Sequence, residues 1–218
     1  MMDAAELSSW PHVYRPGLDA RRDAPVLLML HGTGGNEREI LSLADAIDPE
    51  AAVLAPRGRV SEHGATRWFR RIAEGQFDVD DVNVKAAELA EFVAWARQEY
   101  GLAPGMDARP IIAVGFSNGA NIALALAVLH PETVTLAMAF SGMYPLGNRE
   151  LPLPLPDSRV LLLNGEADPM APSSSVDQLE TELLRAGAGV ERVARSGGHG
   201  ITAEEIEKAQ AWLATAAS

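Results

Sequence analysis

The chain contains no cysteine, which excludes several kinds of structure and chemistry at once. Without thiols it cannot form a disulfide framework, a thiolate metal site or a cysteine nucleophile, and it carries no sign of an oxidising compartment. Basic residues are also scarce, since 18 Lys and Arg stand against 30 Asp and Glu, for a formal charge of −12. Because nonspecific nucleic-acid binding depends on neutralising phosphates, this charge argues against a nucleic-acid partner.

Long apolar runs are absent as well. The most apolar stretches fall far short of the roughly 20 residues that span a bilayer, so we expect no membrane anchor. The first ten residues include Asp3 and Glu6 and lack both a basic start and an apolar core, unlike a secretory signal peptide. We therefore expect a cytoplasmic protein.

The composition is otherwise that of an ordinary globular protein, with 47% hydrophobic and 22% charged residues. A chain of 218 residues can bury a substantial core, and no shift in composition marks a boundary within it. We expect residues 1–218 to form a single domain.

Short apolar runs alternate with longer segments of helical periodicity. We predict strands at residues 12–15, 26–30, 51–55, 110–114, 135–140, 159–163 and 190–194. Several of these runs are apolar throughout, as expected of parallel strands that are buried on both faces. The alternation predicts an α/β fold with a mostly parallel central sheet flanked by helices.

Three helices have local signals of their own. Apolar residues at helical spacing from Val82 to Tyr100 predict a helix that packs on the sheet and stops at Gly101. Two pairs of residues with capping-box spacing predict the starts of two later helices; they are Ser174 with Asp177 and Thr202 with Glu205.

Residues 115–119 read Gly-Phe-Ser-Asn-Gly, between an apolar predicted strand and an alanine-rich helical segment. In a nucleophile elbow, a serine occupies a strained strand-to-helix turn, and the glycines on either side leave room for the crowded backbone. Ser117 is therefore the candidate nucleophile. The alternative is a glycine-bracketed turn in front of a buried helix, and the rest of the chain must decide between them.

Residues that could serve as a base, an acid and an oxyanion donor follow three more predicted strands. They lie at the edge of the sheet where open α/β folds bind ligands. His199 can accept the serine proton, and Asp168 can hold its imidazole in the required tautomer. Backbone amides of Thr33 and Asn118 are the predicted donors to an oxyanion. The order Ser117, Asp168, His199 is the order of the α/β-hydrolase template.

Other residues compete for the acid and base roles. Asp168, which precedes a proline, also fits a simple turn, while Asp157 precedes its strand and Asp177 looks like a capping residue. Of the five histidines, only His199 combines a glycine-rich loop with the right place in the chain, and His31 is expected to orient its own loop. The histidines show no close ligand spacing, so we expect no metal and no other cofactor.

The motifs at residues 31–35, 115–120, 165–169 and 198–200 resemble those of the phospholipase/carboxylesterase family, and the resemblance covers nearly the whole chain. It implies an α/β-hydrolase fold without a substantial cap domain, and activity on carboxylic esters, thioesters or lysophospholipids. It also implies Ser117, Asp168 and His199 as the catalytic triad, Thr33 and Asn118 as oxyanion donors, and allows a homodimer. Thioesterase-type members usually have leucine and glutamine where this chain has Thr33 and Asn118, which argues against protein depalmitoylation.

The segment 57–77 bears on substrate choice. Its arginines are interleaved with aromatic residues, and in the resembling family this region borders the active site. We expect an apolar substrate pocket of Trp68, Phe69, Phe77 and Met143. One of the loop's arginines is expected to meet a substrate carboxylate or phosphate, and the candidates are Arg57, Arg59, Arg67, Arg70 and Arg71. Alternatively, the arginines pair with the acidic residues Glu74, Asp78, Asp80 and Asp81 and only hold the loop.

Together these features predict a serine hydrolase that cleaves small or medium-chain carboxylic esters through an acyl-enzyme. A lysophospholipase or an acyl-thioesterase is the alternative of the same class. From another class, a ligand-binding protein that kept the fold and lost the chemistry is possible, because fold does not determine function.

Overall fold

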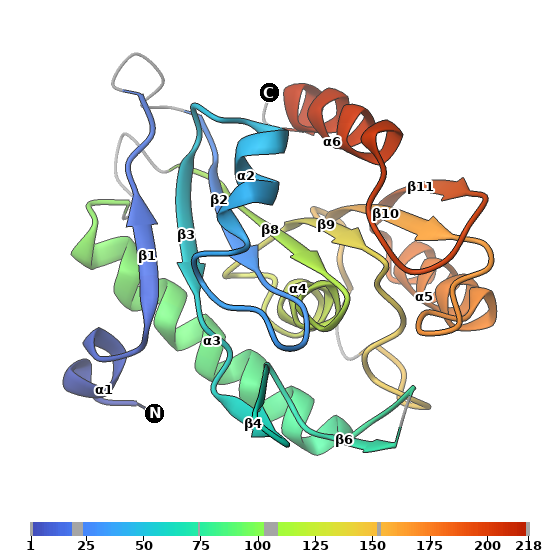
Figure 1. Cartoon of the computed structure of the whole chain (residues 1–218), viewed down its shortest axis with the longest axis horizontal. Helices are drawn as coiled ribbons and strands as arrows, with labels where there is room; N and C mark the ends of the chain where they lie inside the picture. Colours follow the sequence, from blue (N-terminus) through green and yellow to red (C-terminus); the bar gives the residue numbers. More distant parts are fainter. Residues whose placement is uncertain (1, 19–23, 74, 103–108, 152–153, 217–218) are drawn as a thin grey trace.

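A computed structural model describes residues 2–18, 24–73, 75–102, 109–151 and 154–216 of the chain. Over these residues, a seven-stranded sheet in the order β1-β3-β2-β8-β9-β10-β11 forms the centre of the protein (Figure 1). Its strands are β1 (His12–Arg15), β2 (Val26–Leu30), β3 (Ala52–Pro56), β8 (Ile111–Phe116), β9 (Leu136–Phe140), β10 (Arg159–Gly165) and β11 (Gly189–Arg195). Strand β1 is antiparallel to β3, and every other pair of neighbours is parallel. The predicted mostly parallel sheet and all of its predicted strands are confirmed.

The inner strands β2, β3, β8 and β9 are buried on both faces, and strand β2 shows why these strands lack polar residues. Val26, Leu28 and Leu30 point into one hydrophobic core, while Leu27 and Met29 point into the other. The first core is covered by α3 (Val79–Glu99), α4 (Asn118–Leu129) and α5 (Ser173–Arg185). Helices α2 (Leu41–Ile47) and α6 (Ala203–Ala216) cover the second core (Figure 1).

The local signals of helices α3 and α6 are confirmed. The predicted apolar stripe of α3 is buried up to Ala96, and Gly101 follows its end with a positive φ of 67°. Ahead of α6, the N–H of Thr202 donates to Glu205 Oε2 at 2.8 Å and the N–H of Glu205 donates to Thr202 Oγ1 at 3.3 Å. This reciprocal pair is the predicted capping box.

The capping box predicted at Ser174 and Asp177 is wrong. Helix α5 begins at Ser173, and its N-cap position is held by Pro172, two residues before the predicted N-cap, with no side-chain hydrogen bond. Asp177 instead accepts a hydrogen bond of 2.7 Å from Arg192 on the neighbouring strand β11. A tertiary ion pair therefore uses the carboxylate that the sequence spacing assigned to the helix terminus.

Several short elements were not predicted. The N-terminal helix α1 (Ala4–Ser8) is closed by a capping box of Asp3 and Glu6, a signal that the sequence does contain. The segment interpreted as a loop forms two small hairpins, β4 (Val60–Glu62) with β5 (Ala65–Arg67) and β6 (Arg71–Ala73) with β7 (Gln76–Phe77). Both hairpins lie at the carboxyl edge of the sheet (Figure 1).

The strand order places the candidate site. Strand β2 has β3 on one side and β8 on the other, so the connections that follow β2 and β8 leave the sheet at a reversal of strand order. Open α/β sheets bind ligands in such a crevice.

Within the part of the chain that the structure describes, no helix is long and apolar enough to cross a membrane.

Candidate active site

Ser117 lies in a strained turn between β8 and α4. Its φ of 55° and ψ of −119° are unusual for a residue with a side chain. A Cβ atom at Gly115 would lie 2.2 Å from the carbonyl oxygen of Gly119, and one at Gly119 would lie 1.9 Å from the carbonyl oxygen of Leu30. Neither distance is possible for a real side chain, so both glycines are required for β8, β2 and α4 to approach this closely. The local geometry is that of a nucleophile elbow.

Asp168 and His199 come together from the loops that follow β10 and β11. His199 Nδ1 lies 2.8 Å from Asp168 Oδ2, and the aspartate side chain is fully buried. The second carboxylate oxygen, Oδ1, accepts hydrogen bonds from the backbone N–H groups of Met170 at 2.8 Å and Ala171 at 3.2 Å. Because the carboxylate can only accept, Nδ1 of a neutral His199 carries the hydrogen and Nε2 carries the lone pair.

The imidazole is also adjacent to the elbow. Its ring centroid lies 5.0 Å from that of Phe116, the residue before Ser117. The structure thus brings the three predicted triad residues to one edge of the sheet, from three separate strand ends.

Arg195, at the end of β11, braces the loop that carries His199. Its Nη2 donates to the carbonyl oxygens of Gly198 at 3.0 Å and Gly200 at 2.7 Å, on both sides of the histidine. Its Nε lies 2.8 Å from a carboxylate oxygen of Glu205, which is completely buried and belongs to the capping box of α6. Sequence reasoning missed this arginine, although its position directly before the glycine-rich loop was a usable signal.

The competing acids and bases lie elsewhere. Asp157 is exposed at the opposite end of β10, and Asp177 is paired with Arg192. His12 is engaged by Trp10 and Tyr100, His63 is exposed, and His130 lies beside Glu132. None of these side chains contacts the Asp168–His199 pair in the structure.

His31 holds the loop after β2, as predicted for a structural role. Its Nε2 accepts a hydrogen bond of 2.9 Å from the N–H of Gly58, and its Nδ1 lies 2.7 Å from the carbonyl oxygen of Gly32. Burial lowers the pKa of this imidazole below its ordinary value, because the charged form would lose its hydration. A neutral His31 with its hydrogen on Nδ1 satisfies both contacts.

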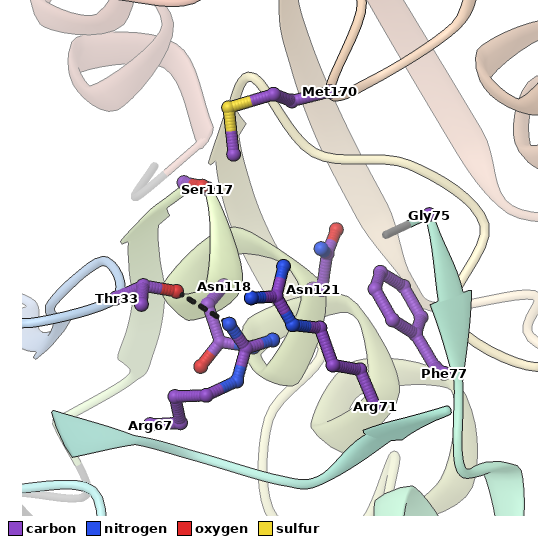
Figure 2. Close-up of a pocket in the computed structure, with 9 residues that line it drawn as sticks. All are labelled: Thr33, Arg67, Arg71, Gly75, Phe77, Ser117, Asn118, Asn121 and Met170. Atoms are coloured by element: carbon purple, nitrogen blue, oxygen red, sulfur yellow. Dashed lines mark hydrogen bonds between the residues drawn. The ribbon is translucent and has the colours of Figure 1, made fainter. Parts of the chain in front are cut away.

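A cavity of about 230 Å³ opens beside the serine. Its lining residues come from the elbow, helix α4, the loop after β2, the two hairpins and the loop after β10, and are Thr33, Arg67, Arg71, Gly75, Phe77, Ser117, Asn118, Asn121 and Met170. Figure 2 shows the guanidinium groups of Arg67 and Arg71 next to each other, with Thr33 on one side and Phe77 on the other.

The predicted pocket residues divide into two groups. Arg71 and Phe77 line this cavity, and Met143 lines a second one of about 600 Å³ that shares Phe77 with the first. Trp68 and Phe69, with exposed fractions of 3% and 0%, are packed in the core and line neither. Arg67, another of the candidate arginines, also lines the first cavity, whereas Gly75, Asn121 and Met170 were not predicted.

The model of the phospholipase/carboxylesterase family matches residues 18–217 of the chain. The chain belongs to this family. It is 37% identical to a putative hydrolase, MhqD, of Bacillus subtilis, over 92% of this chain and 96% of that protein. Among solved structures, the carboxylesterase of Bacillus cereus matches with a TM-score of 0.88 and 39% identity, over 96% of this chain and 95% of that one.

A further relative, YahD, whose structure was determined with malic acid, matches with a TM-score of 0.84 and 29% identity, over 95% of this chain and 99% of its own. These likenesses show the α/β-hydrolase fold that the sequence motifs implied. The protein is thus a hydrolase of the carboxylesterase type by family.

The arginines of this family member have different neighbours. The terminal nitrogen of Arg70 lies 3.2 Å from Asp78 and 3.4 Å from Asp81, as the ion-pair alternative predicted. Arg71 Nε lies 3.0 Å from Glu62, and this contact lowers the pKa of the Glu62 carboxyl. Of these two arginines, Arg71 also lines the cavity. Glu74 lies outside the described residues.

Arg67 connects the hairpins to the loop after β2. Its Nη1 donates to Thr33 Oγ1 at 2.9 Å, and its Nε lies 3.3 Å from the carbonyl oxygen of Phe69 and 3.5 Å from Glu62. The N–H of Gly34 donates to the carbonyl oxygen of Thr66 at 2.8 Å, so the loop is held by backbone as well.

Over the ranges that the structure covers, no three His, Asp or Glu side chains gather as a metal site would require.

Proposed function

We propose that this carboxylesterase-family protein is a serine hydrolase that cleaves small carboxylic esters with Ser117, His199 and Asp168. The observation that carries the proposal is the 2.8 Å contact between His199 Nδ1 and buried Asp168, beside a serine in a nucleophile elbow. This contact supports the tautomer that a general base needs.

In the proposed reaction, Ser117 Oγ attacks the ester carbonyl carbon while its proton passes to His199 Nε2. The backbone N–H groups of Thr33 and Asn118 stabilise the negative charge that develops on the carbonyl oxygen. The C–O bond to the alcohol then breaks, and the alcohol leaves with the proton from His199. Water hydrolyses the acyl-enzyme by the same steps, which returns Ser117 and releases the carboxylic acid.

The size of the cavity favours short acyl groups. Ser117 lines the cavity of about 230 Å³, which is smaller than the roughly 300–1,000 Å³ of pockets that hold drug-sized ligands, whereas the adjoining cavity of about 600 Å³ is lined by none of the proposed catalytic residues. The malic acid in the structure of YahD is also a small molecule. For this reason we favour small esters over long-chain lysophospholipids or acyl thioesters as substrates.

Labelling with a fluorophosphonate tests the proposal directly. We expect stoichiometric modification of Ser117, located by mass spectrometry, together with turnover of p-nitrophenyl acetate and loss of both in Ser117→Ala. A chain-length series of p-nitrophenyl esters should show the highest kcat/KM for the shorter acyl groups. Neither labelling nor turnover in the folded wild-type protein would instead support a non-catalytic ligand-binding protein.

A further inference from the structure

Helix α4 carries polar side chains in its first turn only. Of its 12 residues, Asn118 and Asn121 are the two with polar side chains, and every residue from Asn118 to Val128 is buried. Asn121 has an exposed fraction of 6%. Because burial of an amide costs free energy unless the amide forms hydrogen bonds, the presence of Asn121 on this apolar helix requires an explanation.

The oxygen of the Asn121 carboxamide is fixed by the protein. Its Oδ1 accepts a hydrogen bond of 2.8 Å from the backbone N–H of Met143, in the segment that follows β9. A backbone N–H can only donate, so the oxygen and the nitrogen of this side chain cannot be exchanged. Nδ2 therefore points away from Met143, and it forms no hydrogen bond to any residue that the structure describes.

The nitrogen of this carboxamide belongs to the wall of the cavity beside the nucleophile. Asn121 and Ser117 both line the cavity, and Figure 2 shows the Asn121 carboxamide beside the guanidinium group of Arg71. Nδ2 of Asn118 is buried and has no partner among the described residues, whereas Nδ2 of Asn121 keeps access to solvent. Asn121 therefore presents the two N–H bonds of an amide to a group that occupies the cavity.

Asn121 lies one helical turn beyond the nucleophile. Its backbone N–H donates to the carbonyl oxygen of Ser117 at 3.0 Å, and four residues of an α-helix rise by about 6 Å. A hydrogen bond from Nδ2 covers about 3 Å of this distance. An acceptor two or three bonds beyond the ester carbonyl carbon, at about 1.5 Å per bond, lies within reach of Nδ2.

The position of His199 indicates which part of an ester enters this cavity. The leaving alcohol must receive its proton from His199, so the alcohol has to lie on the histidine side of Ser117. Among the described residues, His199 does not line the cavity, whereas Thr33 and Asn118, whose amides are the proposed oxyanion donors, do. The cavity therefore suits the acyl part of the substrate.

From the fixed oxygen, the unpaired nitrogen and the position of Asn121, we propose that this residue selects esters whose acyl chain carries an acceptor oxygen close to the ester carbonyl. Nδ2 donates to that oxygen while Ser117 attacks the carbonyl carbon. A methylene group in the same place displaces water from Nδ2 and leaves the donor unpaired. This inference rests on the proposed function and narrows it from small esters to oxygen-bearing ones. Methyl methoxyacetate would form the methoxyacetyl ester of Ser117 and methanol, and water would then release methoxyacetic acid.

Ester pairs that exchange one oxygen for one methylene group test the acyl preference. Methyl methoxyacetate and methyl butanoate differ two bonds from the ester carbonyl carbon, and methyl 3-methoxypropanoate and methyl pentanoate differ three bonds from it. Each ratio of kcat/KM is divided by the ratio of the hydroxide-catalysed rates, because a nearby oxygen also activates the carbonyl. In at least one pair we expect the wild-type enzyme to favour the ether by about three- to tenfold, the usual worth of a neutral hydrogen bond.

A third pair tests the side on which the oxygen is recognised. 2-Methoxyethyl acetate and butyl acetate make the same exchange in the alcohol part of the ester. Because the alcohol lies on the histidine side of Ser117, away from Asn121, we expect no corrected preference within this pair.

Asn121→Asp assigns the preference to the donor. The aspartate keeps the shape of the side chain and an oxygen for the Met143 N–H, but its carboxylate has no N–H to donate, so the corrected ratio should fall to about one or below. Both esters of a pair meet the same site, so a general loss of activity cancels in the ratio. Asn36→Asp is the matched control. Asn36 Oδ1 also accepts from backbone N–H groups, those of Arg38 at 2.9 Å and Glu39 at 3.1 Å, and Asn36 does not line the cavity.

The wild-type ratios alone can overturn the proposal, if both acyl-side pairs show no corrected preference. A preference that persists in Asn121→Asp would also overturn it, and one confined to the alcohol-side pair would overturn the acyl assignment. If no ester is cleaved and Ser117 is not labelled, the proposed function fails first. The side-chain amide NMR signals of ¹⁵N-labelled Ser117→Ala then decide the present inference. A shift of the Asn121 Nδ2–H signals with the two ethers, and none with the alkyl esters, supports it, and equal responses contradict it.

Discussion

The side-chain oxygen of Asn118 accepts a hydrogen bond of 2.8 Å from the backbone N–H of Trp68. Trp68 is in turn fixed by its indole N–H, which donates to the carbonyl oxygen of His31 at 2.9 Å. The residue after the nucleophile is thus tied to the segment that carries Arg67 and Arg71. Asn118 therefore contributes to the wall of the cavity as well as to the elbow.

Replacing Asn118 tests this connection. In Asn118→Ala the buried N–H of Trp68 loses its acceptor, which should lower the free energy of unfolding by about 1–3 kcal/mol. Asn118→Asp keeps an acceptor of the same shape and should retain more stability, while its negative charge opposes the oxyanion and lowers kcat. Urea unfolding and steady-state kinetics of both variants provide the measurements. Equal stability of Asn118→Ala and wild type would show that this hydrogen bond is unimportant.

The sequence predicted the sheet and the positions of Ser117, Asp168 and His199 after strand ends because both depend on local patterns. Strands buried on two faces are apolar at every position, and the catalytic candidates follow directly where those strands end. Trp68 shows the limit of this approach. Because Trp68 lies in a segment rich in arginine, we predicted that its side chain lines a pocket. Two long-range hydrogen bonds, from its backbone N–H to Asn118 and from its indole N–H to His31, instead hold the side chain in the core.

Contacts between distant segments explain the other differences. The ion pair of Asp177 with Arg192 joins a helix to a strand, and no spacing within α5 could reveal it. The bracing of the His199 loop by Arg195 depends on Glu205, which reaches it from α6. Such pairs join residues far apart in the chain, so no local pattern in a single sequence indicates them.

Arg195 is expected to act as a positioning residue for His199. Removing its charge would leave buried Glu205 without a counter-ion, so Arg195→Lys is the sharper variant. Lysine can keep the ion pair but cannot reproduce the planar donors that reach Gly198 and Gly200. We expect kcat to fall by up to about a hundredfold, with KM nearly unchanged, because misplacement of a catalytic group costs rate rather than affinity.

Arg192→Lys is the matched control for Arg195→Lys. Arg192 lies on the same strand and is also held by two carboxylates, Asp177 and Glu180, but it does not contact the His199 loop. Its substitution should leave kcat unaltered. A similar loss of kcat in both variants, with parallel losses of stability, would assign Arg195 a structural role only.

Gly119 is expected to tolerate no side chain at all. The Cβ atom of Gly119→Ala would lie 1.9 Å from the carbonyl oxygen of Leu30, so β2 and α4 would have to separate. We expect a loss of about 3 kcal/mol or more in the free energy of unfolding, or failure to fold. In contrast, Gly200→Ala meets no atom within 4 Å and should be nearly neutral in stability. Thermal unfolding of the two variants makes the comparison.

Asp168→Asn should leave the fold intact and remove most of the activity. An amide can present its N–H₂ to His199 Nδ1, which places the hydrogen of the imidazole on Nε2 and blocks acceptance of the Ser117 proton. We expect kcat for a p-nitrophenyl ester to fall by about four orders of magnitude. Asp177→Asn, which changes an exposed carboxylate away from the site, is the control. Near-normal activity of Asp168→Asn would mean that another group orients the base.

His31 should make the stability of the protein depend on pH near neutrality. Its pKa is lowered in the folded protein from the ordinary 6.5, so the unfolded chain binds a proton just below pH 6.5 that the native protein does not. The stabilisation by neutral His31 is therefore complete above pH 6.5 and decreases as the pH falls through that value, by at most about 1.4 kcal/mol per pH unit.

The variant His31→Gln should be less stable than wild type at pH 8, because it cannot reproduce both contacts of the imidazole with Gly58 and Gly32. It should nevertheless lose less stability between pH 7 and pH 5, because it has no proton to take up at this site. Carboxylates contribute equally to both curves, so the difference between them isolates His31. Denaturant unfolding at four pH values tests this, and parallel curves for wild type and His31→Gln would contradict it.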